Sequence, residues 1–428
     1  MKKGIKRISR SIALLTLIFS ISQVSFGYSV LTHQAIIDSL WDNSIKPLVL
    51  KRFPNATAEQ LKEAHAYSYG GAIIQDMGYY PFGSKLFSDL THYVRSGDFV
   101  EALIAESQDI NEYAFALGAL AHYAADNNGH PIAVNRAVPI LYPELRAKYG
   151  QEVTYAENPS AHIKTEFGFD VVQVARGRYA PESYHDFIGF KVSKDVLDRA
   201  FKRTYGLELK DVFKSVDLAL GSFRLSVSTI IPQATKIAWE TKKDDIEKLT
   251  PGITRDKFIY TLSRASYEKE WGKGYEKPGL FAKTMAVFLR VFPKVGPFKA
   301  VAFKPPTPET EKLFQESFNA TIERYREILA QSQSGRLNLP NKDFDTGRTT
   351  SPGEYKLADE AYAKLLDKLE DKNFKTVTPD LRANILAFYS DLNAPFATKK
   401  DKDGWREVLD DLNKLKAVQA EPAQTTRR

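Results

Sequence analysis

The sequence predicts an all-α protein, and three observations support this. Apolar residues recur at helical spacing along most of the chain. Thr57-Ala-Glu-Gln60 has the pattern of a capping box, which starts a helix. Signals for β-strands are sparse, and only Gln151 to Tyr155 is expected to form a short strand. With 43% hydrophobic and 26% charged residues, the 428-residue chain has a normal globular balance, which excludes disordered, collagen-like and multi-span membrane proteins.

The helical pattern is clearest in the first 245 residues. The segment 111–126 is rich in Ala and Leu, as a buried helix is, and Asn127-Asn-Gly-His-Pro131 should end it. Pro232 should kink the last helix of this region. Helices are expected at 30–42, 57–69, 98–107, 111–126, 160–176, 192–205 and 209–241.

The rest of the chain divides into smaller units. A chain of this length favours two or three domains, since one core seldom grows beyond about 250–300 residues. The segment 331–353 contains Ser, Asn, Gly and Pro and is expected to be a linker or long loop. The expected units are a main domain at 28–245, a helical extension at 246–330, the linker 331–353, and a C-terminal unit at 354–428. This last unit should contain helices at 354–372 and 402–417 and a disordered tail at 420–428.

Residues 1–27 have the pattern of a secretory signal peptide. Five basic residues precede the apolar run 12–19, and small residues follow at Ser25 and Gly27. The alternative is an uncleaved anchor, but the apolar run is shorter than the roughly 20 residues that span a bilayer. We therefore expect an exported protein, periplasmic or extracellular. Cleavage after Gly27 would expose the α-amine of Tyr28, which can bind a metal once deprotonated.

Composition restricts the chemistry further. The net charge is +7, but removing the five basic residues of 1–27 from the total of 60 leaves 55 against 53 acidic residues. A nucleic-acid binder usually carries a strong basic stripe, which such a balance does not favour. The chain has no Cys, which excludes disulfides, thiol nucleophiles and Cys-based zinc sites. A metal site must therefore use His, Asp, Glu and backbone groups.

All seven His residues lie in the first 185 positions. His122 and Asp126 are four apart on an expected helix, as are His162 and Glu166, so each pair shares one helix face. An imidazole and a carboxylate together suit zinc. A single His is more often an ordinary helix residue, but the whole set indicates a metal site. The set is completed by His33, Asp76, His92 and His130, whereas His65 and His185 are expected to lie outside it.

In this order along the chain, the set resembles the zinc-dependent phospholipase C family of bacteria. That superfamily also contains zinc-dependent single-strand nucleases. The motif resemblance covers about residues 28–170. It implies a multi-helix bundle of the zinc-dependent phospholipase C type, with 28–245 as the catalytic domain and a C-terminal helical extension.

The resemblance implies up to three zinc ions. The first would be held by Asp76, His92, His122 and Asp126. The second would be held by His130, His162 and Glu166, and the third by Tyr28, His33 and Asp126, so that Asp126 bridges two ions. This chain has Tyr28 where the family usually has Trp, and a long gap separates His130 from His162. Glu166 in place of Asp follows the phospholipase side of the superfamily.

The resemblance implies hydrolysis of a phosphodiester by metal-activated water, with a phospholipid as the expected substrate. Asp76 would be a ligand and also a candidate base. Tyr79, Tyr80 and Phe82 are candidates for a head-group pocket through cation–π contacts, or else plain core residues. Two alternatives remain: a secreted zinc-dependent nuclease, which the near-neutral charge disfavours, and a non-catalytic exported helical protein stabilised by metal.

The segment 277–304 has six basic residues and no acid. Its apolar residues follow one helix face, so it can lie on an anionic membrane surface. The alternative is a helix that faces the core with solvated lysines.

Overall fold

The computed structural model describes residues 30–175, 190–227, short pieces within 239–255, and 303–418. Several expectations fall on residues outside this description. These are the signal peptide 1–27, Tyr28, His185, the Pro232 kink, the basic segment 277–304 up to residue 302, and the tail 420–428.

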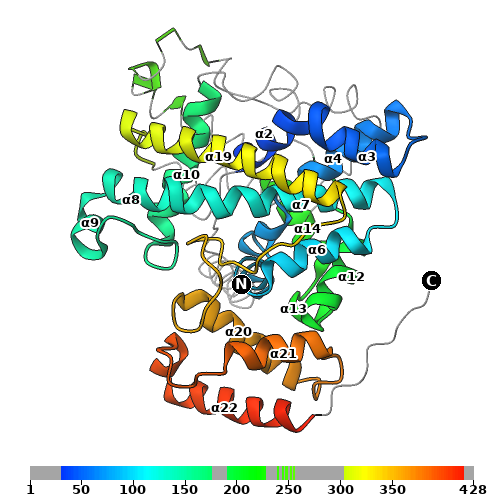
Figure 1. The fold of residues 1–428 in the computed structure, drawn as a ribbon. Coiled ribbons are helices and arrows are strands. Elements are labelled where there is room, and N and C mark those ends of the chain that lie inside the picture. The colour runs from blue at the N-terminus through cyan, green and yellow to red at the C-terminus, as the bar shows by residue number, and fades with distance from the viewer. Residues whose placement is uncertain are drawn as a thin grey trace, which may run out of the picture.

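The expected all-α fold is confirmed (Figure 1). Within the described ranges no strand forms, and one isolated bridge joins Lys342 and Thr349. None of the helices in these ranges is long and apolar enough to cross a bilayer. The α-helices are α2 (Val30–Leu40), α3 (Lys46–Arg52), α4 (Ala58–Gly71), α5 (Lys85–Tyr93), α6 (Ser96–Glu106), α7 (Ile110–Gly129), α8 (Asn135–Leu141), α9 (Pro143–Tyr149), α10 (Pro159–Ala175), α12 (Lys194–Tyr205), α13 (Leu209–Val212), α14 (Val216–Leu225), α19 (Pro308–Gln333), α20 (Lys356–Glu370), α21 (Pro379–Phe388) and α22 (Lys402–Ala417). Four short turns of other types are η1 (Trp41–Ile45), η2 (Ile74–Tyr79), η3 (His130–Val134) and η6 (Ala397–Lys400).

Helix α7 runs through the middle of the molecule (Figure 1). It packs against α4, α6 and α19, and its residues from Tyr113 to Asp126 are buried. The Asp109 side chain caps its start by accepting hydrogen bonds from two backbone N–H groups. From α19, the hydroxyl of Tyr325 donates to the carbonyl of Leu117 at 2.8 Å. The helix is thus held along its whole length.

Helices α4 and α7 cross at very short range because both carry glycine at the crossing. A Cβ atom added to Gly118 would lie 2.1 Å from the carbonyl oxygen of Ser68 on α4. A Cβ added to Gly71 would lie 1.9 Å from the carbonyl oxygen of Phe115 on α7. Any larger side chain there would force the two backbones apart.

The predicted helix boundaries are partly correct. The capping box of Thr57 and Gln60 is present at the start of α4, and α10 spans nearly the residues expected. The expected stop at 127–131 is confirmed, because α7 ends at Gly129. The chain nevertheless stays helical through the π-turn η3 into α8, which was not expected. Pro131, which has no N–H, stands in the first turn of η3, where the α-helical hydrogen-bond pattern of α7 has ended.

Two other expectations are corrected, and one helix was not predicted. The helix predicted at 209–241 is broken after Val212, and α14 starts anew with Ser215 as its cap. Residues 151–155 form no strand; the N–H of Val153 bonds the carbonyl of Asn135 within an irregular turn. Helix α21, which starts at Pro379 after the capping Thr378, lies outside the helices predicted from sequence.

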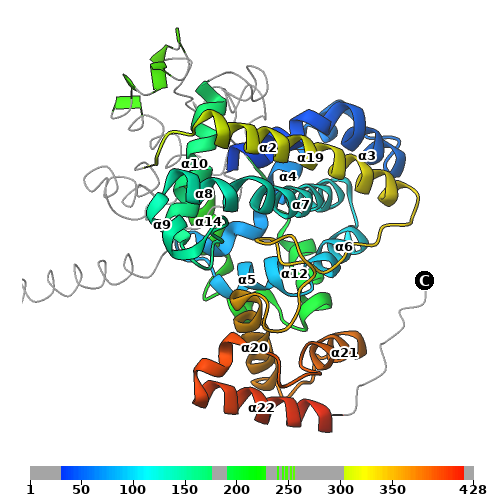
Figure 2. The same ribbon diagram turned by 60° about the vertical axis from the view of Figure 1, so that its left-hand side comes forward.

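Helices α20, α21 and α22 form a layer at the end of the molecule away from α2, α4 and α19 (Figures 1 and 2). Helix α20 joins this layer to the rest by packing on α5. Residues 331–333 of the expected linker belong to the end of α19, and 334–353 form a loop, as expected, that does more than link two units. Leu339, Phe344 and Asp345 are buried in it, and Phe344 lies among the core residues of the N-terminal helices.

We expect Gly118→Ala to lower the free energy of unfolding by about 1–3 kcal/mol, because the new methyl group meets a backbone carbonyl that cannot rotate away. Gly221→Ala on α14 is the matched control, since a Cβ there meets nothing within 4 Å. Urea unfolding followed by circular dichroism measures both. Equal stability of Gly118→Ala and the parent would contradict the close crossing.

Candidate metal centre

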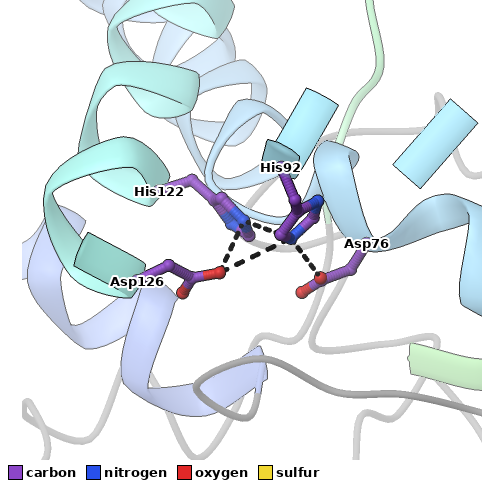
Figure 3. A group of neighbouring side chains, drawn as sticks. All are labelled: Asp76, His92, His122 and Asp126. Atoms are coloured by element: carbon purple, nitrogen blue, oxygen red, sulfur yellow. Dashed lines mark hydrogen bonds and ion pairs between the residues drawn. The ribbon is translucent and has the colours of Figure 1, made fainter. Parts of the chain in front are cut away.

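Four side chains that are far apart in the sequence converge in the core as a first cluster: Asp76, His92, His122 and Asp126. Their ligand atoms all lie within 4.8 Å of one another, and all four residues are buried (Figure 3). Asp76 comes from η2, His92 from α5, and the other two from α7. The i, i+4 spacing on α7 therefore places both of its side chains on the face that α5 and η2 cover.

Backbone carbonyls orient the two imidazoles of the first cluster. Nδ1 of His122 lies 2.9 Å from the carbonyl oxygen of Ala72, and Nδ1 of His92 lies 2.8 Å from that of Ser88. A carbonyl oxygen only accepts, so each Nδ1 carries the proton and donates. In the neutral imidazoles each Nε2 then presents a lone pair to the centre of the cluster.

These lone pairs face other acceptors. The two Nε2 atoms are 3.3 Å apart, and Nε2 of His92 lies 3.3 Å from Asp76 Oδ1 and 3.5 Å from Asp126 Oδ2. Nε2 of His122 lies 3.1 Å from the same Asp126 oxygen. Four zinc ligands at about 2.0–2.1 Å in a tetrahedron are about 3.3 Å apart. These four distances in the first cluster match the edges of a zinc tetrahedron.

A second cluster is formed by His130 on η3 with His162 and Glu166 on α10, all buried. Nε2 of His162 lies 2.8 Å from the side-chain oxygen of Asn135, so it donates. Its Nδ1 then presents a lone pair to Glu166 Oε1 at 2.6 Å. Among the described residues, neither carboxylate oxygen of Glu166 has a hydrogen-bond donor. Nδ1 of His162 and Oε1 of Glu166 therefore also need a proton or a cation to balance them.

Asp126 stands at the junction of these groups. Its Oδ2 faces His92 and His122 and lies 3.7 Å from Nε2 of His130. Its Oδ1 lies 3.5 Å from Nε2 of His33 on α2. The His33 ring stacks on that of His122, with centroids 4.5 Å apart. The two oxygens of one carboxylate therefore point to different imidazoles, which is the arrangement of a bridging ligand.

The start of α2 is held next to the centre. The N–H of Leu31 donates to Asp170 Oδ2 at 3.0 Å, and the hydroxyl of Thr32 donates to Oδ1 of the same residue at 2.5 Å. Asp170 lies on α10, the helix that carries Glu166. These bonds position His33.

The electrostatics of the two clusters require compensation by positive charge. Burial raises the pKa of Glu166 well above its usual range, and the carboxylate of Asp126 adds to this. Burial works against protonation of His92, but Asp126 and Asp76 outweigh it and raise its pKa to about 10. Burial, reinforced by His130, lowers the pKa of His162 to about 3.

Among the described residues, no Lys or Arg nitrogen lies within 4.0 Å of a carboxylate oxygen of Asp76, Asp126 or Glu166. Buried carboxylates are costly unless a cation or hydrogen-bond donors balance them. The donor set, its burial and its missing counter-charges all fit divalent metal ions with nitrogen and oxygen ligands.

The aromatic residues expected near the site take different positions. The ring of Tyr79 meets His92 edge-on, with centroids 5.7 Å apart, and is buried. Tyr80 packs edge-on against Phe223 in the core. Phe82 is partly buried and has a positive φ of 62°. A role of these residues in binding a head group stays a prediction.

His65 lies outside both clusters, as expected. It stacks on Trp41 with ring centroids 4.0 Å apart, and its Nε2 lies 3.2 Å from Asp38 Oδ1.

Sequence reasoning missed two polar residues that touch the second cluster. Asn135 contacts His162, as described, and Asp345 Oδ1 lies 3.1 Å from His130 Nδ1. Asp345 stands in the loop 331–353, which sequence reasoning had assigned as a linker. The available signal was Asp343-Phe344-Asp345, an aromatic residue between two acids in an otherwise polar loop.

Comparison with known proteins gives one match. A family model described as zinc dependent phospholipase C matches residues 32–215, the segment that carries His33, Asp76 and every member of the two clusters. No curated protein and no solved structure matches the chain.

Zinc added to the metal-stripped protein should raise its thermal midpoint, because an ion between facing acceptors removes their repulsion. A ligand at a hundred times its Kd stabilises the folded state by about 2.7 kcal/mol. Differential scanning fluorimetry measures the shift. His122→Ala should reduce it strongly, whereas the control His65→Ala should retain it. A full shift in His122→Ala would contradict the first cluster as a metal site.

Proposed function

The chain belongs to the zinc-dependent phospholipase C family through residues 32–215, and from this premise we propose that it is an exported zinc-dependent phosphoric diester hydrolase acting on phospholipids. Export is inferred from residues 1–27, and 28–245 is proposed as the catalytic domain. One observation supports the proposal: in two adjacent buried clusters, imidazole nitrogens and carboxylate oxygens converge within 4.8 Å of one another, and no Lys or Arg of the described residues pairs with these carboxylates.

We assign the ligands by cluster. Asp76, His92, His122 and Asp126 would hold one zinc, and His130, His162 and Glu166 a second. A third would be held by His33 and Asp126 with the amine and carbonyl of Tyr28. Bound zinc supplies Lewis-acid polarisation of phosphoryl oxygens and a water of lowered pKa, available as a nucleophile at neutral pH.

Groups of the protein would accept the proton of the attacking water and orient that water. Asp76 is the proposed base, because its Oδ1 lies 3.3 Å from Nε2 of His92 in the first cluster and has no hydrogen-bond donor among the described residues. Ser88 and Ala72 would act through the backbone by holding His92 and His122 in the ligating tautomer.

The substrate class follows from the family, and the charge balance supports it. Beyond residue 27 the acidic and basic residues nearly cancel, which favours a phospholipid over a polyanion such as nucleic acid. Tyr79, whose ring meets His92, is the best placed of the three aromatic residues to contact a head group. Contact of the basic segment 277–304 with a lipid surface is a further part of this proposal.

The processed protein should release phosphocholine from phosphatidylcholine vesicles. Single-stranded DNA and a simple phosphodiester are offered in parallel, and zinc per chain is measured by plasma mass spectrometry. Release of nucleotides in preference to phosphocholine would identify a nuclease instead. Tightly bound zinc without turnover of any of the three would identify a metal-stabilised protein without catalysis.

Asp126→Asn should lose zinc and activity together, because one neutral amide cannot replace a carboxylate that serves two ions. The loss in zinc affinity should exceed the 10- to 100-fold effect, roughly, of removing an outer-shell partner. Asp38→Asn is the control, since Asp38 pairs with His65 away from the clusters. Chelator competition and vesicle turnover measure both variants. Activity retained in Asp126→Asn would contradict the bridging role.

A further inference from the structure

The loop that contains residues 339–347 is anchored on the helices of the metal centre. The side-chain oxygen of Asn341 accepts hydrogen bonds from the N–H groups of Gly97 and Asp98 at the start of α6, at 3.0 Å each. The N–H of Phe344 donates to the carbonyl of His92 at 3.2 Å. Gly347 has a φ of +68°, and a Cβ there would lie 2.7 Å from the carbonyl oxygen of Asn127 on α7. The loop therefore has one close-fitting path over the centre.

Phe344 places this loop against the first cluster. It is fully buried, and its ring meets His92 and His122 with centroid separations of 5.2 Å and 6.0 Å. The next residue, Asp345, is 2% exposed and points to the second cluster.

Within the described residues, the Asp345 carboxylate contacts donors from η3, from α5 and from the start of α20. Oδ1 lies 3.1 Å from His130 Nδ1. Oδ2 accepts from the hydroxyl of Tyr93 at 3.1 Å and from the hydroxyl of Tyr355. No Lys or Arg of the described chain pairs with it. The carboxylate is thus buried, negatively charged and aimed at a proposed ligand.

The contact with His130 determines which ring nitrogen can bind a metal. An ionised carboxylate only accepts, so Nδ1 of His130 carries a proton and donates. Nε2 then presents its lone pair toward Asp126 Oδ2, 3.7 Å away. A metal-bound His commonly donates its other N–H to a carboxylate, which fixes the ring and raises its basicity.

The same residue also acts on His162 through Asn135. The side-chain N–H of Asn135 donates to the backbone carbonyl of Asp345 at 2.6 Å, which turns the amide oxygen toward His162 Nε2. That oxygen accepts from Nε2 and leaves Nδ1 of His162 facing Glu166. One residue of the loop thus orients both imidazoles of the second cluster.

We propose that Asp345 is a positioning residue of the second metal site, holding His130 and, through Asn135, His162 with their ligating nitrogens toward the ion. This inference rests on the proposed function, since it concerns the same metal centre. Asp345 lies beyond residue 215, so the C-terminal part of the chain supplies a component of the site that the matched segment lacks.

The test compares Asp345→Asn with Asp343→Asn in the full processed chain. Asp343 lies in the same loop but accepts from the N–H and hydroxyl of Thr346 instead of contacting a cluster residue. Competition with a chromophoric chelator measures zinc affinity, and Co²⁺ substitution gives an absorption spectrum of the ligand field. Asp345→Asn should weaken one site about 10- to 100-fold and change the cobalt spectrum. Asp343→Asn should leave both unchanged.

The outcomes separate the two proposals. Zinc affinities and cobalt spectra of Asp345→Asn that equal those of Asp343→Asn would overturn the role of Asp345 and leave the proposed function intact. A parent protein that binds no zinc would overturn both. If circular dichroism shows that Asp345→Asn does not fold, Tyr355→Phe replaces it, because it removes only one hydroxyl that holds the carboxylate. A several-fold weaker site is then expected, and an unchanged one would refute the proposal.

Discussion

Buried acceptors without donors are the constraint on which the structure of the centre depends. The oxygens of Asp126 and Glu166 and the ring nitrogens that face them lie where water is excluded. Such groups repel one another unless positive charge lies between them. The match of residues 32–215 to the zinc-dependent phospholipase C family model agrees with this arrangement, because divalent ions turn the repulsion into coordination. The rest of the fold holds these groups a few ångströms apart.

The close crossing of α4 and α7 has a direct chemical consequence. Gly71 and Gly118 let the backbones approach until the carbonyl of Ala72, just past the end of α4, reaches Nδ1 of His122. That bond sets the tautomer which directs Nε2 to the cluster. Packing and chemistry are therefore linked through two glycines, neither of which is a candidate ligand.

The expectations that succeeded were local. The pairs His122/Asp126 and His162/Glu166 could be identified because helical spacing alone puts their members on one face. The cap at Thr57 is equally local. The predicted stop at 127–131 coincides with the end of α7 at Gly129, but the continuation through η3 into α8 depends on the path of the following chain and was not predicted. The loop 331–353 was misjudged because its polar composition does not show that Phe344 and Asp345 are covered by helices formed more than 200 residues earlier.

By itself the sequence determined the helical class and the ordered set of imidazoles and carboxylates, since both depend on short-range spacing and on residue chemistry. Only the tertiary structure decided that the set divides into two adjacent clusters around Asp126. It also decided which nitrogen of each ring faces inward, and that Asp345 lies beside His130. The physical reason is that these properties depend on hydrogen bonds between segments distant in the chain. Spacing along a helix carries no information about which carbonyl or carboxylate another segment will bring to a ring.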